Sequence, residues 1–92
     1  MEITGKIIRI HEEKSFGTNG FRKRTTHIET DEQYPQTIEV EFVQDKVELL
    51  DKFQPGQTVK ISINLRGREW VNPEGEVVIF NTIQGWAIIQ VN

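Results

Sequence analysis

Two arginines and a tryptophan at alternate positions are the residues of this chain that best fit binding of a charged, aromatic ligand. Arg66, Arg68 and Trp70 are spaced i, i+2 and i+4. On a β-strand this spacing places all three side chains on one face. Guanidinium groups hold phosphates, and an indole stacks on a nucleobase. The pattern therefore indicates a surface that binds a single nucleic-acid strand.

Five aromatic side chains are candidates for contact with a ligand, and all but Phe80 have an alternative interpretation. Trp70 precedes a turn, so it could instead cover the rim of a sheet or lie in a subunit interface. Phe80 falls across that turn and would extend an aromatic surface beside Trp70. Phe42 ends an apolar alternation, which favours packing in the core. Phe16 and Phe21 flank a glycine-containing turn and either contact a ligand or fix the loop to the body of the protein.

A second basic cluster would add a phosphate-binding patch if it lies beside the arginines described above. It consists of Arg22, Lys23 and Arg24, and the alternative is an ordinary solvated end of a strand. The net charge of −3 opposes binding of nucleic acid through overall electrostatic attraction. Screening limits each patch to about 10 Å, so the local distribution of charge matters more than the total.

Catalytic or metal chemistry has little support in the sequence. His11 and His27 fall on different predicted strands, without the spacing of a metal-binding pair. The carboxylate pair Glu39 and Glu41 has i, i+2 spacing, which places both groups on an open strand face where they ionise normally. Nucleophile, phosphate-loop and dinucleotide motifs are absent. We expect a protein that is not an enzyme and that uses neither a cofactor nor a metal ion.

Composition predicts one small domain over residues 1–92. Hydrophobic residues make up 36% of the chain and charged residues 27%, which is ordinary for a globular domain. The longest apolar run is far shorter than the ~20 residues that a membrane span needs. The chain has no cysteine, which fits a reducing cytoplasm. We therefore expect a cytoplasmic protein without a membrane segment.

Five strands and one short helix are the elements that would position the candidate residues. We predict strands over residues 2–11, 22–30, 36–43, 58–70 and 76–91, with Asn19-Gly20 as a turn. In the strand over 58–70, the residues expected to face the core are Val59, Ile61, Ile63 and Leu65. We predict a helix over 45–53 that begins with a capping box of Asp45 and Glu48. In the first strand, the apolar alternation slips near residues 5–8, which predicts a bulge or bend. The last segment is one strand or a strand pair, because Gly85 is expected to break or bend it.

A helix between the third and fourth strands is the arrangement of the OB-fold, a five-stranded Greek-key barrel. The chain is thus predicted to be all-β with one short helix. An SH3-like barrel is the alternative, which the position of the helix disfavours.

Residues 56–75 resemble bacterial single-stranded DNA-binding proteins of the OB-fold class. The matching string is Gly56-Gln57-x-Val59-x-Ile61, then Leu65-Arg66-x-Arg68-x-Trp70, then a turn closed by Gly75. This resemblance implies that Trp70 and Phe42 stack bases and that Arg66 and Arg68 contact the backbone. It also implies a homo-oligomer, either a dimer or a tetramer.

Nearly the whole chain is also similar to a group of small bacterial proteins of unknown function. The similarity lies in the opening Met1-Glu2-Ile3-Thr4-Gly5-Lys6-Ile7, the central Ile28-Glu29-Thr30 with Glu32-Gln33-Tyr34-Pro35, and the trailing Gly85-Trp86. This second resemblance supports the fold more than it supports an activity.

These observations together predict an OB-fold domain that binds single-stranded nucleic acid without strong sequence preference. DNA is favoured over RNA as the ligand. The groove would lie between the loop after the first strand and the last hairpin. The residues predicted to line it are Arg22, Lys23, Arg24, Arg66 and Arg68 for phosphates, and Trp70 with Phe42 or Phe80 for bases. The alternative is a protein-interaction or structural module that does not bind nucleic acid, favoured by the net acidity.

Overall fold

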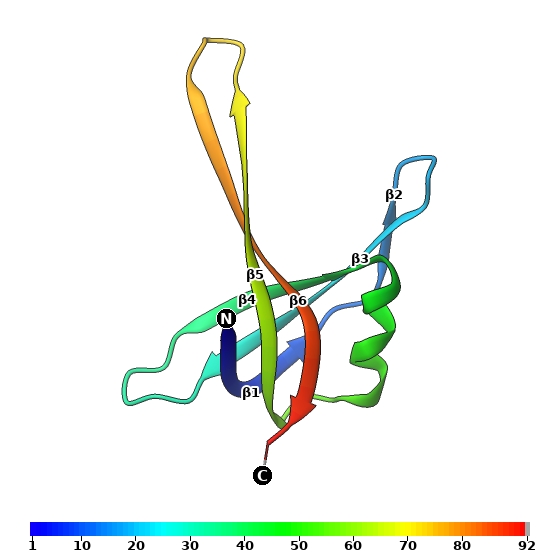
Figure 1. Ribbon diagram of the computed structural model, residues 1–92, viewed down its shortest axis with the longest axis vertical. Coiled ribbons are helices and arrows are strands. Elements are labelled where there is room, and N and C mark those ends of the chain that lie inside the picture. Colours follow the sequence, from blue (N-terminus) through cyan, green and yellow to red (C-terminus); the bar gives the residue numbers. More distant parts are fainter. Residues whose placement is uncertain (92) are drawn as a thin grey trace.

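The computed structural model describes residues 1–91, so Asn92, the last residue of the predicted domain, lies outside the described part. Six strands and one 3₁₀ helix follow one another along the chain. They are β1 (Glu2–Ile10), β2 (Lys14–Phe16), β3 (Phe21–Thr30), β4 (Thr37–Val43), η1 (Gln44–Lys52), β5 (Thr58–Val71) and β6 (Val77–Gln90). Two hairpins, β2–β3 and β5–β6, extend from the same end of the molecule (Figure 1).

The strand pairings close a ring, which we call the barrel. Strand β1 pairs antiparallel with both β3 and β5, β3 pairs with β4, and β5 pairs with β6. The ring closes where β4 meets β6 in a parallel pairing of Glu41 with Gln84. β1 serves two neighbours because its register shifts between Ile7 and Arg9. That shift confirms the predicted irregularity near residues 5–8.

The interior of the barrel follows the alternation of apolar residues. Val59, Ile61 and Ile63 of β5 are buried, as predicted. They pack with residues of the other strands and of η1, namely Ile7, Ile28, Val40, Phe42 and Leu50. The prediction for Leu65 was wrong, because 62% of this residue is exposed to solvent. At that position β5 extends beyond the barrel. The alternation of apolar residues continues there, but Leu65 has no core to pack against.

Beyond the barrel, β5 and β6 continue as a two-stranded ribbon that we call the arm, comprising residues 65–71 and 77–83. Seven antiparallel pairs hold it together, from Leu65 opposite Ile83 to Val71 opposite Val77. The turn at its tip is organised by Asn72, whose Oδ1 accepts hydrogen bonds from the backbone N–H groups of Glu74 and Glu76 at 3.0 and 2.8 Å. Figure 1 shows the arm in yellow and orange, projecting from the barrel.

The helix differs from its prediction in type and in its first turn. It is a 3₁₀ helix from Gln44 to Lys52, whose N-cap is Val43 without a side-chain hydrogen bond. The predicted capping box was therefore wrong. The carboxylate of Glu48 instead accepts two hydrogen bonds from the Arg22 guanidinium, at 2.6 and 3.1 Å. The Glu48 carboxylate, which the capping-box pattern predicts would bond to the start of the helix, therefore bonds to a distant residue instead.

The number of strands also differs, because the short strand β2 was not predicted. Lys14, Ser15 and Phe16 pair with Lys23, Arg22 and Phe21 across the turn that contains Asn19 and Gly20. The helix consequently follows the fourth strand, although it joins the same two segments of chain as predicted. The last segment is one continuous strand, β6, rather than a broken pair. Gly85 lies at a register shift, because it pairs with Ile63 where the β5–β6 ladder slips.

Candidate nucleic-acid interface

The register of the arm gives it two different faces. Arg66, Arg68 and Trp70 lie directly opposite Thr82, Phe80 and Val78. Because directly paired residues of antiparallel strands point to the same side, these six residues form one face, which we call the front face. The spacing that predicts a common face for Arg66, Arg68 and Trp70 is therefore realised in the structure.

A compact aromatic and cationic cluster occupies the front face. The rings of Trp70 and Phe80 are 6.3 Å apart and inclined at 49°. The guanidinium carbon of Arg68 lies 5.6 Å from the centre of the Phe80 ring, in cation–π range. Trp70 is 47% exposed and Phe80 46% exposed. The cluster thus offers accessible ring surface beside a positive charge.

The two arginines of the front face keep their charge available. Arg66 Nε donates a hydrogen bond of 3.2 Å to the neutral Gln84 side chain. Within residues 1–91, neither Arg66 nor Arg68 forms a salt bridge. Both guanidinium groups can therefore still bind an anion.

The predicted basic patch of Arg22, Lys23 and Arg24 is divided between two faces of β3. Arg22 and Arg24 share the parity of Thr26 and Ile28, which are buried, and so they turn toward η1. Arg22 contacts Glu48, and Arg24 Nη1 donates a hydrogen bond of 2.8 Å to Asp51 Oδ1. These two side chains fix the β2–β3 hairpin to the helix. The prediction of one three-residue phosphate patch was wrong.

The Arg22–Glu48 contact alters the protonation of both partners. The hydrogen bond with Arg22 lowers the pKa of Glu48 below its ordinary value. The same bond raises the pKa of Arg22. Both groups are therefore charged at neutral pH and form an ion pair with each other.

Lys23 is the member of the basic cluster that lies on the other face of β3, with Phe21. Its Nζ lies 5.2 Å from the centre of the Phe16 ring and 3.7 Å from Glu41 Oε2. Phe16 and Phe21 are paired across the β2–β3 hairpin, and both are exposed. The hairpin thus carries its own aromatic pair with a cation above it.

Phe42 does not belong to the interface. It is completely buried, and it packs in the core of the barrel. The stacking role that the resemblance implied for Phe42 is therefore wrong, and the core packing favoured by the apolar alternation is confirmed. A base cannot reach this ring without opening the barrel.

The two hairpins face each other across a hollow of about 560 Å³. Phe21 and Lys23 line it from β3, and Arg66, Arg68 and Phe80 line it from the arm. Its volume is in the usual range of ligand sites, 300–1,000 Å³. Glu41 also lines the hollow and is the acidic residue among its walls. The arm side of the hollow therefore carries positive charge, and the β4 side carries a negative charge.

Several residues of the hollow were missed or left open by sequence reasoning. Phe21 was left between two interpretations because its loop had no register. Thr82 and Gln84 were not considered, although both line the hollow. The signal for them is the alternation from Phe80 along β6, which places them on the same side as Phe80.

The structure gives no sign of a metal site or a membrane span in its described part. Among residues 1–91, there is no group of three or more histidine, aspartate or glutamate side chains placed to hold a metal ion. In the same residues, no helix has the length and apolar character required to cross a membrane.

Comparisons with known proteins bear on both the fold and the family. A crystal structure of the mitochondrial single-stranded DNA-binding protein Rim1 from S. cerevisiae superposes with a TM-score of 0.71, at 13% identity, over 99% of this chain and 92% of that one. PriB from Ralstonia solanacearum superposes with a TM-score of 0.72, at 9% identity, over 99% and 96% of the two chains. At these identities the likeness establishes the fold, and the predicted OB-fold is confirmed.

The sequence comparisons identify a family without a known activity. No curated protein matches the chain. Residues 2–89 match the family described as a domain of unknown function, DUF3127. The match spans nearly the whole chain and agrees with the predicted similarity to small proteins of unknown function. The chain is therefore an OB-fold member of the DUF3127 family.

Proposed function

We propose that this protein binds single-stranded nucleic acid, with DNA as the preferred ligand, in the hollow between the β2–β3 hairpin and the arm. The observation that carries the proposal is the duplication of one motif on the two facing hairpins. Each hairpin presents an exposed aromatic pair with a cation over one ring: Phe16 and Phe21 with Lys23, and Trp70 and Phe80 with Arg68.

The chemistry of the two hairpins suits a flexible strand rather than a duplex. Aromatic rings stack on unpaired bases of any sequence, and each stacked base contributes about 1–3 kcal/mol. Lys23, Arg66 and Arg68 supply positive charge for phosphates within the same hollow. Stacking and phosphate contacts read neither base edges nor sequence, so the binding is expected to be largely independent of sequence. Rim1, a structural neighbour, is named as a single-stranded DNA-binding protein, which supports this choice of ligand.

The proposal includes self-association and a cytoplasmic location. The barrel carries the exposed apolar residues Trp86 and Ile89 on β6, neither of which lines the hollow. Exposed apolar residues of this kind suit an interface between subunits. Sedimentation at micromolar concentration would detect a dimer or tetramer, and a monomer that persists at high concentration would contradict this part of the proposal.

Titration of tryptophan fluorescence with oligo-dT tests the proposed function. In the variant Trp86→Phe, Trp70 is the sole indole, so its emission reports on the arm alone. We expect quenching on addition of the oligonucleotide at low salt, and weaker binding at moderate salt. Loss of one stacked base in Trp70→Ala should raise the dissociation constant by about 5- to 150-fold, measured by anisotropy of a labelled strand.

Tyr34→Ala is the control for that substitution. Tyr34 is also an exposed aromatic residue, but it does not line the hollow, so its removal should leave the affinity unchanged. Unchanged emission and unchanged anisotropy at high concentrations of protein and strand would refute nucleic-acid binding.

A further inference from the structure

Glu41 is an acidic residue at the centre of the proposed nucleic-acid site. It lies directly opposite Thr25 on β3 and pairs with Gln84 on β6, so it sits between the two hairpins. It lines the hollow between them and also two hollows that adjoin it, of about 510 and 320 Å³. Its side chain is 19% exposed. A largely buried carboxylate therefore lies in the wall of the hollow in which we propose that a strand binds.

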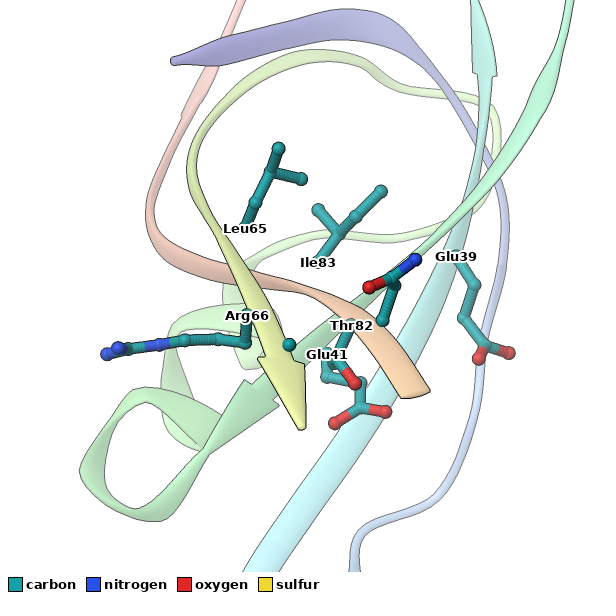
Figure 2. Close-up of a pocket in the computed structure, with 8 residues that line it drawn as sticks. Glu39, Glu41, Leu65, Arg66, Thr82 and Ile83 are labelled. Atoms are coloured by element: carbon teal, nitrogen blue, oxygen red, sulfur yellow. The ribbon is translucent and has the colours of Figure 1, made fainter. Parts of the chain in front are cut away.

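The carboxylate of Glu41 retains the capacity to accept hydrogen bonds. Its Oε2 lies 3.7 Å from Lys23 Nζ, which is an ion-pair distance but longer than a hydrogen bond. Figure 2 shows the Arg66 guanidinium directed away from the Glu41 carboxylate. Lone pairs on both oxygens are therefore available to donors from a ligand. Such donors would be favourable, because a carboxylate withdrawn from water needs hydrogen bonds to compensate for its lost hydration.

The edge of a base suits this position better than a phosphate does. A phosphate would be repelled by the negative charge of Glu41, whereas a base carries N–H donors on its edge. Phe21 and Phe80 line the same hollow from the β2–β3 hairpin and from the arm. A base that stacks on one of these rings can direct its Watson–Crick edge toward Glu41, because that edge is unpaired in a single strand.

The pairing of Lys23 with Glu41 selects among the four bases. Side by side, the two groups present a cationic donor followed by two carboxylate acceptors. The Watson–Crick edge of guanine presents the complementary order, with the O6 acceptor followed by the N1–H and N2–H donors. Cytosine, adenine and thymine each have a single donor group on this edge, so each leaves one carboxylate oxygen without a donor. Guanine is therefore the base that satisfies all three groups.

We propose that Glu41 and Lys23 recognise a guanine base within the bound strand. The two carboxylate oxygens of Glu41 accept hydrogen bonds from N1–H and N2–H, and the Lys23 ammonium donates one to O6. This inference rests on the proposed function and adds to it a preference at one position of the strand, while stacking and phosphate contacts elsewhere stay independent of sequence. Lys23 has three N–H donors, so its contact with a base is compatible with a contact to a phosphate.

Short labelled strands that differ in one base test the proposal with the intact protein. Each strand is oligo-dT with a single central deoxyguanosine, deoxyinosine, deoxyadenosine or deoxycytidine. Deoxyinosine is the matched control, because its base keeps the O6 and N1–H groups of guanine and lacks the N2 amino group. Anisotropy should show that the deoxyguanosine strand binds tightest, about fivefold or more tighter than the deoxyinosine strand.

Two isosteric substitutions on β4 locate the contact. Glu41→Gln replaces one acceptor oxygen by an amino donor, so the ratio of the affinities for the deoxyguanosine and deoxyinosine strands should fall to about one. Glu39→Gln is the control and should leave this ratio unchanged. It removes the same charge from the same face of β4, but Glu39 does not line the hollow between the hairpins, and its Oε1 lies 2.9 Å from His27 Nε2. The ratio is insensitive to net charge, since the loss of a carboxylate affects both strands alike.

Three outcomes would overturn the proposal. Equal affinity of the parent protein for the deoxyguanosine and deoxyinosine strands would refute recognition of guanine and leave nucleic-acid binding in place. A preference for deoxyguanosine that persists in Glu41→Gln would assign it to another group. Failure of every strand to bind would refute the proposed function and this inference together.

Discussion

Identical residue types have different roles in this protein because their strands place them in different surroundings. Arg22 is bonded to Glu48 and fixes a hairpin to a helix, whereas Arg68 lies over Phe80 and forms no salt bridge within residues 1–91. The alternation of β5 was sufficient to predict the common face of Arg66, Arg68 and Trp70. The basic cluster of β3 could not be assigned, because Thr25 and Thr26 gave no apolar signal for the register.

The salt dependence of binding distinguishes these arginines. For a single strand, each phosphate contact contributes about 0.7 to the slope of log K against log salt concentration. Arg66→Gln and Arg68→Gln should each lower the slope by about that amount and weaken binding to all sequences alike. Arg22→Gln is the control, because its guanidinium is already bonded to Glu48, so the slope should stay the same. Equal slopes for all four proteins would remove the arginines of the arm from the interface.

At the scale of elements, close backbone approach decides what the strands tolerate. The apolar pattern predicted β5 and the buried residues of β4, because a period of two with one buried face leaves little freedom. The capping-box prediction failed at the first turn of η1, because the Glu48 carboxylate bonds to Arg22 rather than to the helix backbone. Gly85 was expected to break or bend its strand; β6 is unbroken, and Gly85 lets it pass over the ring of Phe42.

Gly85→Ala should destabilise the barrel. A Cβ atom on Gly85 would lie 2.5 Å from Cζ and 2.7 Å from Cε1 of Phe42, which is fully buried and has no space to move. Overpacking of this kind costs about 1–3 kcal/mol, and thermal unfolding should show the midpoint falling by about 4–8 °C per kcal/mol. In the arm, a Cβ on Gly67 would meet Asn81 at 3.5 Å, so Gly67→Ala should leave the midpoint nearly unchanged. A Gly85→Ala midpoint equal to that of the parent protein would show that the core can adjust.

At the scale of the whole molecule, the five long strands and the helix between β4 and β5 were predicted, in agreement with the OB-fold of the structural neighbours, whereas β2 was not. The projection of the arm beyond the barrel could not be predicted, because a strand pattern does not reveal where the barrel ends and a free ribbon begins. The attachment of the β2–β3 hairpin to η1 was also unforeseen, since it depends on pairs separated by 26 and 27 positions in the sequence.

That attachment should make stability depend on pH in a defined direction. The bond with Arg22 lowers the pKa of Glu48 in the folded state, so its contribution is complete above the unfolded value of about 4.3. It is lost as the pH falls through the lowered folded value. Thermal unfolding of Glu48→Gln should therefore give a lower midpoint than the parent protein at pH 7, and the difference should shrink toward pH 3. A difference independent of pH would assign the effect to packing rather than to charge.

Within the described residues, the pairing of Glu41 with Gln84 is the one β-ladder pairing between β4 and β6, the two strands that close the barrel. Both residues also line the hollow between the hairpins. A nucleic-acid strand bound in the hollow would contact both β3 and the arm beside this pairing. It would thereby help to hold β4 and β6 together. If nucleic acid binds in this hollow as proposed, its binding would therefore also stabilise the closed barrel.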